Sequence, residues 1–117
     1  MNPLTITEPA ILLCINHTYK AGVDPYDATR GVWALSERRL RAELAFGIYQ
    51  GRIMGVYRIQ KWHRAGSTPY VSGRLIDFTL HPTDWEFTGI PATKDIWERY
   101  VGQPAPRLRG PARYVNI

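Results

Sequence analysis

The sequence is poor in the residues that build disulfides and metal sites. It has one cysteine, Cys14, among 117 residues, which excludes an intrachain disulfide and a cysteine-rich zinc site. Because Cys14 lies in the apolar run 10–15, we expect a buried and unreactive thiol. The three histidines, His17, His63 and His81, show neither i, i+3 nor i, i+4 spacing. We therefore expect no metal site and no cofactor.

Long apolar segments are also missing. No apolar run approaches the ~20 residues that a membrane-spanning helix needs. Residues 1–4 lack the basic start and long apolar stretch of a secretory signal, so we expect a cytoplasmic protein without a membrane partner. A hydrophobic content of 44% and four tryptophans favour a folded core. The length suits one domain spanning residues 1–117.

Positive charge is concentrated in residues 30–64. This stretch has eight basic and two acidic residues, whereas the remainder has seven basic and eight acidic ones, for a net charge of +5. The same stretch holds Trp33 and Trp62. A field of one sign attracts polyanions, and indole rings stack on bases. A solvated helix face and an arginine-decorated strand would show the same pattern, so the charge indicates a binding surface and no particular reaction.

Local signals predict a mixed order of short helices and strands. Asp24 and Pro25 are typical of a helix start, with Gly31 near its end, and Ser36 is a suitable N-cap for a helix over residues 37–42. Leu40 and Leu44 have the i, i+4 spacing that would place both side chains on the side of the helix that faces the protein core. Further expected elements are strands at 10–15, 85–90 and 112–117, a helix at 94–100, and a β-hairpin of 44–49 and 52–62.

The sequence of the second hairpin strand predicts one side that faces the core and another that mixes apolar and cationic residues. Strand alternation places Ile53, Gly55, Tyr57 and Ile59 toward the core. Trp85 and Trp97 are assigned to packing. The element order predicts an α+β fold in which an antiparallel sheet curls into a small pseudo-barrel with two or three short helices.

Residues 29–36 and 53–59 resemble the centre of the PUA-like superfamily, and its EVE and ASCH branches are the most similar. Gly31-Val32-Trp33 is similar to the EVE start, and Met54-Gly55-Val56-Tyr57 resembles the family's glycine strand. The usual Lys-Gly-Asp turn is replaced here by Arg41-Ala42-Glu43, and the loop 64–73 has no counterpart. The resemblance implies a cleft beside the basic helix that holds RNA or a modified base.

The residues at matching positions form the candidate nucleic-acid site. We expect stacking by Trp33 or Trp62 and phosphate contacts from Arg38, Arg39 or Arg41. The other candidates that surround the expected cleft are Arg30, Ser36, Arg58 and His63. RNA or single-stranded or modified-base DNA fits better than duplex, because no groove-reading helix motif is present.

Two other functions remain open at this stage. Small ASCH-type hydrolases use a lysine, a threonine and a glutamate in the same cleft, and Lys20, Thr29 and Glu86 are conceivable counterparts for action on a modified nucleoside. A protein-interaction module, including a homodimer, is the third possibility, because aromatic residues and arginine are enriched at interfaces.

Overall fold

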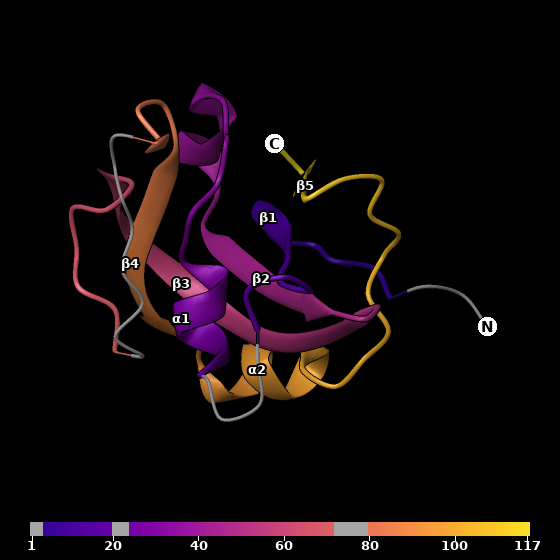
Figure 1. Cartoon of the computed structure of the whole chain (residues 1–117). Coiled ribbons are helices and arrows are strands. Elements are labelled where there is room, and N and C mark those ends of the chain that lie inside the picture. The colour runs from indigo at the N-terminus through magenta and orange to yellow at the C-terminus, as the bar shows by residue number, and fades with distance from the viewer. Residues whose placement is uncertain (1–3, 20–23, 72–79) are drawn as a thin grey trace.

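Five strands form one mixed sheet in the computed structural model, which describes residues 4–19, 24–71 and 80–117 (Figure 1). The strand order across the sheet is β4-β3-β2-β1-β5. In chain order the elements are β1 (Ala10–Cys14), α1 (Pro25–Thr29), the 3-10 helix η1 (Glu37–Arg41), β2 (Leu44–Tyr49), β3 (Arg52–Arg64), β4 (Trp85–Pro91), α2 (Lys94–Tyr100) and β5 (Ala112–Val115).

The predicted start signals of the two N-terminal helices are confirmed. The Asp24 carboxylate accepts a hydrogen bond from the Tyr26 amide at 2.9 Å, and Pro25 occupies the first helical position of α1. The Ser36 hydroxyl accepts a hydrogen bond from the Arg38 amide at 3.2 Å. These contacts satisfy amides that a helix start otherwise leaves unpaired. The α+β class and the β2–β3 hairpin are also as predicted.

The sheet differs from the predicted antiparallel barrel. Strands β1 and β2 run parallel, whereas β1–β5, β2–β3 and β3–β4 are antiparallel. Within the part of the chain that the structure describes, β4 and β5 do not pair with each other, so the sheet stays open. A parallel pair needs a long crossover, which α1 and η1 provide here. Local turn signals in the sequence indicate only pairs of strands that a short turn connects, so they could not predict the pairing of β1 with β2.

Each face of the sheet carries its own core. On one face, Tyr100 and Ile96 of α2 pack with Leu12, Phe46 and other strand residues. On the opposite face, Ala28 of α1 packs with Ile11, Tyr57, Phe87 and their neighbours. In Figure 1, α1 lies in front of the strands and α2 lies below them. Covering both faces leaves the ends and edges of the sheet as the exposed surface.

Ile53, Gly55 and Tyr57 of β3 are buried as predicted, but Ile53 lies on the other side of the sheet because the pairing register shifts. Gly47 pairs with Gly55, but Ile48 pairs with Ile53, which leaves Met54 as an extra residue. Such a bulge reverses the alternation of side chains. Ile53 therefore belongs to the α2-side core, while Tyr57 belongs to the α1-side core.

Leu40 does not face the core as predicted, since 64% of it is exposed. Residues 37–41 form a 3-10 helix with about three residues per turn. The i, i+4 spacing therefore does not place Leu40 and Leu44 on one helix face, because Leu44 lies in β2.

Residues 30–33 run along the outer edge of β4. The Phe87 amide donates to the Arg30 carbonyl at 2.8 Å, and Trp33 and Trp85 exchange two backbone hydrogen bonds at 2.9 and 2.8 Å. This pairing fixes the segment that leads into η1. As a result, η1 lies beside the first residue of β4.

Candidate nucleic-acid interface

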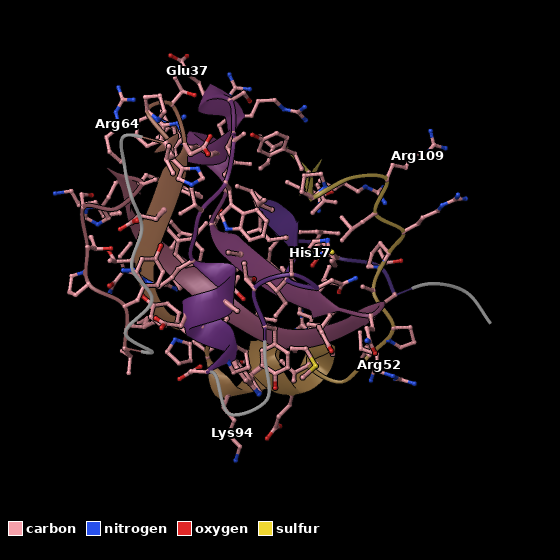
Figure 2. The ribbon with its side chains drawn as sticks, in the orientation of Figure 1. His17, Glu37, Arg52, Arg64, Lys94 and Arg109 are labelled. Atoms are coloured by element: carbon pink, nitrogen blue, oxygen red, sulfur yellow. The ribbon has the colours of Figure 1, made fainter. Side chains whose placement is uncertain are left out.

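A set of arginines and aromatic rings gathers where η1 meets the ends of β3, β4 and β5. We call this surface the basic rim and define it by the residues Arg38, Arg39, Arg41, Arg64, Trp85 and Tyr114. In Figure 2, Glu37 and Arg64 mark this end of the molecule, and Lys94 of α2 lies at the opposite end. The rim thus joins side chains from four separate elements.

Two guanidinium groups lie against the indole of Trp85. The Arg39 guanidinium carbon is 3.6 Å from the ring centre, and that of Arg64 is 4.8 Å from it. Arg39 also donates to the Ser36 carbonyl at 3.0 Å, and Arg64 donates to the Pro82 carbonyl at 2.8 Å. These backbone bonds hold both cations beside the ring, where its negative face offsets part of their charge.

The positive charge of Arg39 is held in a partly dehydrated position. Burial lowers the pKa of Arg39 below its ordinary value, and the nearby cation of Arg64 lowers it further, against the opposing effects of Tyr114 and Glu37. Its Nε atom is buried and has no hydrogen-bond partner among the described residues. Because Arg39 is only 7% exposed, an anion would reach this pair at the exposed Arg64, where it would offset the repulsion between the two cations.

Tyr114 connects η1 to β5. The Arg38 guanidinium carbon lies 4.6 Å from the centre of the Tyr114 ring, and Arg38 Nη2 donates to the Ile117 carbonyl at 3.0 Å. The Tyr114 hydroxyl accepts a hydrogen bond from the Ser36 amide at 2.9 Å. The basic surface of η1 therefore continues onto the C-terminal strand.

A groove of about 650 Å³ lies against η1 and is lined by Ser36, Glu37, Arg38, Leu40 and Arg41. Leu40 offers an exposed apolar surface between two cations. Sugar and base surfaces are apolar and phosphates are anionic, so this combination suits a nucleotide chain.

Glu37 is the carboxylate nearest in sequence to the rim, but no ion pair joins a carboxylate to a rim arginine in the ranges 4–19, 24–71 and 80–117. The ion pairs found there join His81 with Asp84, Lys94 with Glu98, and Arg99 with Glu8. A polyanion at the rim would therefore displace counterions from solution rather than protein carboxylates.

Arg30, a predicted site residue, is not on this surface. It is only 3% exposed. Its Nη2 donates to the Thr68 hydroxyl and, at 3.3 Å, to the Pro69 carbonyl, and its guanidinium lies 4.1 Å from the centre of the Tyr70 ring. Arg30 is therefore buried among partners inside the protein and does not belong to the rim, and its contact with nucleic acid stays a prediction.

Glu86 is the anion at the centre of the same buried cluster. Its carboxylate accepts hydrogen bonds from the amides of Gly66 and Thr68, at 2.6 and 2.9 Å, and from the Tyr70 hydroxyl at 3.1 Å. The Thr68 hydroxyl donates to it as well. Burial, and next the nearby Glu86 charge, raise the pKa of Tyr70 to about 12. This cluster fastens the loop 66–70 over β4.

Trp33 does not provide a stacking surface as predicted. It is 7% exposed, and its Nε1 donates to the Thr29 carbonyl at 2.7 Å. A tryptophan between two loops can pack inward or outward with the same sequence, and here the backbone pairing with Trp85 directs it inward. Its indole is part of the α1-side core.

The remaining candidates lie along β3, where Trp62 and His63 directly precede Arg64 and Arg58 lies further from the rim. Trp62 is half-buried, with its ring centre 5.5 Å from that of Phe87. His63 Nε2 is hydrogen-bonded with the Thr88 hydroxyl at 2.9 Å. Arg58 is exposed, opposite Leu44 and Ile90 in the sheet. No contact joins these three to the aromatic rings of the rim in the described parts of the chain.

Two of the three residues considered for hydrolysis, Thr29 and Glu86, have separate hydrogen-bond partners. Lys20 lies outside the described residues. The Thr29 hydroxyl donates to the Pro25 carbonyl at 2.7 Å and packs against Gly47. The Glu86 carboxylate accepts its hydrogen bonds from the loop 66–70, and no hydrogen bond joins Thr29 to Glu86 among the described residues.

Sequence reasoning missed several residues of the basic surface. Trp85, which we expected to pack in the core, is half-buried with two arginines beside its ring, whereas Trp97 does pack in the core as predicted. Arg107, Arg109, Arg113 and Tyr114 were not considered. A signal for them existed, because no acidic residue follows Glu98 in the sequence.

No protein-family model, curated protein or solved structure matches this chain. In the described parts of the chain, no helix has the length and apolar character to cross a membrane. Those residues also contain no cluster of three or more histidine, cysteine, aspartate or glutamate side chains suited to a metal ion.

Proposed function

We propose that this protein binds single-stranded nucleic acid, RNA or DNA, through the basic rim. The observation that carries the proposal is the pair Arg39 and Arg64 on Trp85. Both cations are oriented by backbone carbonyls, and neither has a carboxylate partner among the described residues. Bases stack on indole rings and on guanidinium planes, and the remaining guanidinium N–H groups bind phosphate.

The geometry of η1 favours a single strand over a duplex. A helix that reads the major groove presents several turns to the base edges. The five residues of η1 form a 3-10 helix that is only ~10 Å long at about 2 Å per residue. Flat rings beside cations instead suit unpaired bases, which leave their faces free.

The resemblance of residues 29–36 and 53–59 to PUA-like domains supports the same proposal. Many of those domains hold RNA or a modified base beside a basic helix, and η1 with Arg38, Arg39 and Arg41 directly follows the first resembling segment in the sequence. Kinship with that superfamily is part of the proposal.

The proposal is tested by fluorescence anisotropy with a labelled 12-nucleotide RNA of mixed sequence. Unlabelled single-stranded RNA, single-stranded DNA and duplex serve as competitors. We expect either single strand to compete at least tenfold better than the duplex. We also expect Arg64→Ala to weaken binding about tenfold, because a charged hydrogen bond and a stacking plane are lost.

Lys94→Ala is the matched control. It removes one positive charge from a side chain that is 88% exposed at the far end of the molecule (Figure 2). Equal losses for Arg64→Ala and Lys94→Ala would contradict a specific rim and indicate attraction to net charge alone. Absence of binding in low salt, together with a concentration-dependent dimer, would favour the interaction module.

A further inference from the structure

A second basic cluster lies beyond the rim, in the segment that leads into β5. Arg107, Arg109 and Arg113 line one pocket together with Gly110 and Ala112, and the pocket has a volume of about 420 Å³. This volume falls within the range of small-molecule sites, roughly 300–1,000 Å³. None of the proposed rim residues lines this pocket.

The backbone of this pocket is anchored on both sides. Arg113 Nη1 donates to the Arg107 carbonyl at 2.9 Å, which closes the segment on itself. The Pro111 carbonyl accepts a hydrogen bond from the Cys14 amide at 2.8 Å, which ties the segment to β1. The guanidinium groups therefore extend from a fixed loop, and Figure 2 shows Arg109 on its outer side.

The pocket concentrates positive charge without an internal anion. Its three arginines have no ion pair among the described residues. No acidic residue lies between Glu98 and Ile117 in the sequence. A ligand that carries more than one negative charge on one compact group fits this site best.

Charge density distinguishes the two kinds of phosphate in a nucleic acid. A phosphodiester inside the strand carries one negative charge, and its neighbours are spread along the backbone. A phosphate monoester carries about −1.5 to −2 at neutral pH and has three strong acceptor oxygens. Arginine forks bind such a group bidentately. Three arginines around one pocket therefore match a terminal phosphate better than an internal one.

The pocket is connected to the rim through Tyr114. A neighbouring cavity is lined by Arg107, Arg113 and Tyr114 among others, and Tyr114 carries the guanidinium of Arg38 on its ring. A strand held at η1 can thus continue past Tyr114 and end at the arginine pocket.

We infer that the pocket of Arg107, Arg109 and Arg113 binds the terminal phosphate monoester of a nucleic-acid strand, and this inference rests on the proposed function. The shared chemistry is a phosphate monoester, which a strand end and a free nucleotide both offer. The strand end is the favoured source because the neighbouring cavity is lined by Arg107 and Arg113 of the pocket and also by Tyr114 of the rim.

The test compares one labelled 12-nucleotide RNA prepared in three forms, with hydroxyls at both ends, with a 5′-phosphate, or with a 3′-phosphate. Anisotropy titrations give the affinity of each form. We expect about a tenfold preference for one of the phosphorylated forms over the form with two hydroxyl ends. Arg109→Ala should remove this preference while leaving the affinity of the unphosphorylated strand within twofold of wild type.

Two further variants keep the test independent of folding. Arg107→Lys preserves the charge but loses the fork of an exposed side chain, so we expect it to reduce the preference by severalfold with unchanged thermal unfolding. Lys94→Ala should retain the full preference. A loss of the preference in Lys94→Ala would overturn the inference.

The outcomes separate this inference from the proposed function. If wild type binds all three strands equally, the pocket does not read a strand end, while the proposed function stands. If no form binds in low salt, the proposed function itself fails. Adenosine monophosphate is the competitor that represents a free nucleotide. If it displaces the unphosphorylated strand as strongly as the phosphorylated strand, the assignment of the pocket to strand ends is overturned.

Discussion

The guanidinium carbon of Arg39 lies 3.6 Å from the centre of the Trp85 ring. Arg39 belongs to η1 and Trp85 begins β4, so this contact exists because residues 30–33 pair with the edge of β4. A desolvated cation–π contact contributes about 2 kcal/mol. The same pair therefore fixes η1 to the sheet. Arg39 itself is only 7% exposed, so the cationic surface beside Trp85 is provided by the exposed Arg64.

Replacement of this indole should weaken binding of single-stranded RNA. We predict that Trp85→Ala lowers the affinity about 5- to 150-fold, because a stacked base contributes ~1–3 kcal/mol. Trp62→Ala, which changes a half-buried indole packed on Phe87, should alter the affinity by less than twofold. Anisotropy titrations measure both, with near-ultraviolet circular dichroism to verify folding. A larger loss for Trp62→Ala than for Trp85→Ala would restore the sequence-based assignment of the stacking residue.

Glu86→Gln should reduce stability rather than binding. The carboxylate accepts four hydrogen bonds, and a glutamine places an NH₂ donor against donors of the loop 66–70. We predict that the free energy of unfolding falls by about 1–3 kcal/mol. Urea denaturation measures this change. RNA affinity well below the unfolding transition should stay within twofold, and a tenfold loss would instead place Glu86 in the binding site.

His63 should make the stability depend on pH. Burial lowers the pKa of His63 below its ordinary value of 6.5, and the nearby Lys61 lowers it further. The unfolded chain therefore binds a proton at a higher pH than the folded protein does. The contribution of the neutral His63 side chain to the free energy of unfolding is complete above about pH 6.5. It is lost as the pH falls toward the pKa of His63 in the folded protein. Urea denaturation from about pH 7.5 to 5 should show this loss, and His63→Gln should reduce it. An equal pH dependence in the variant would assign the effect to other groups.

Gly89 should not tolerate a side chain. A Cβ at this position would lie 2.2 Å from the Arg58 carbonyl oxygen, which belongs to the neighbouring strand and cannot move aside alone. We predict that Gly89→Ala lowers the free energy of unfolding by about 1–3 kcal/mol. Gly110→Ala is the control, because nothing lies within 4 Å of its added Cβ. Equal midpoints in urea for the two variants would contradict the close approach of β3 and β4.

Local chemistry predicted the elements well, but not their long-range partners. The caps at Asp24 and Ser36 and the hairpin of β2 and β3 depend on residues a few positions apart, and all three are as predicted. The parallel pairing of β1 with β2 depends on how a crossover packs, and alternation within one strand carries no information about it. Likewise, the bulge at Met54 placed Ile53 on the other side of the sheet from Tyr57.

The candidate site was predicted in part for the same reason. Arg38, Arg39 and Arg41 follow one another on η1, so charge density located them. Whether an indole faces solvent depends on tertiary packing, which buried Trp33 and left Trp85 between two arginines. The contribution of Tyr114 required knowledge that β5 lies next to η1.

The salt dependence of RNA binding tests the central claim most directly. For single strands, the logarithm of the affinity falls linearly with the logarithm of the salt concentration, with a slope of about −0.7 per neutralised phosphate. The double variant Arg41→Ala, Arg64→Ala removes two exposed cations of the rim, so we predict a slope shallower by about 1.4 than that of wild type. The matched double variant Arg52→Ala, Lys94→Ala, altered away from the rim, should keep the wild-type slope (Figure 2). A flat salt response of the wild type, or equal slopes for the two double variants, would contradict the account.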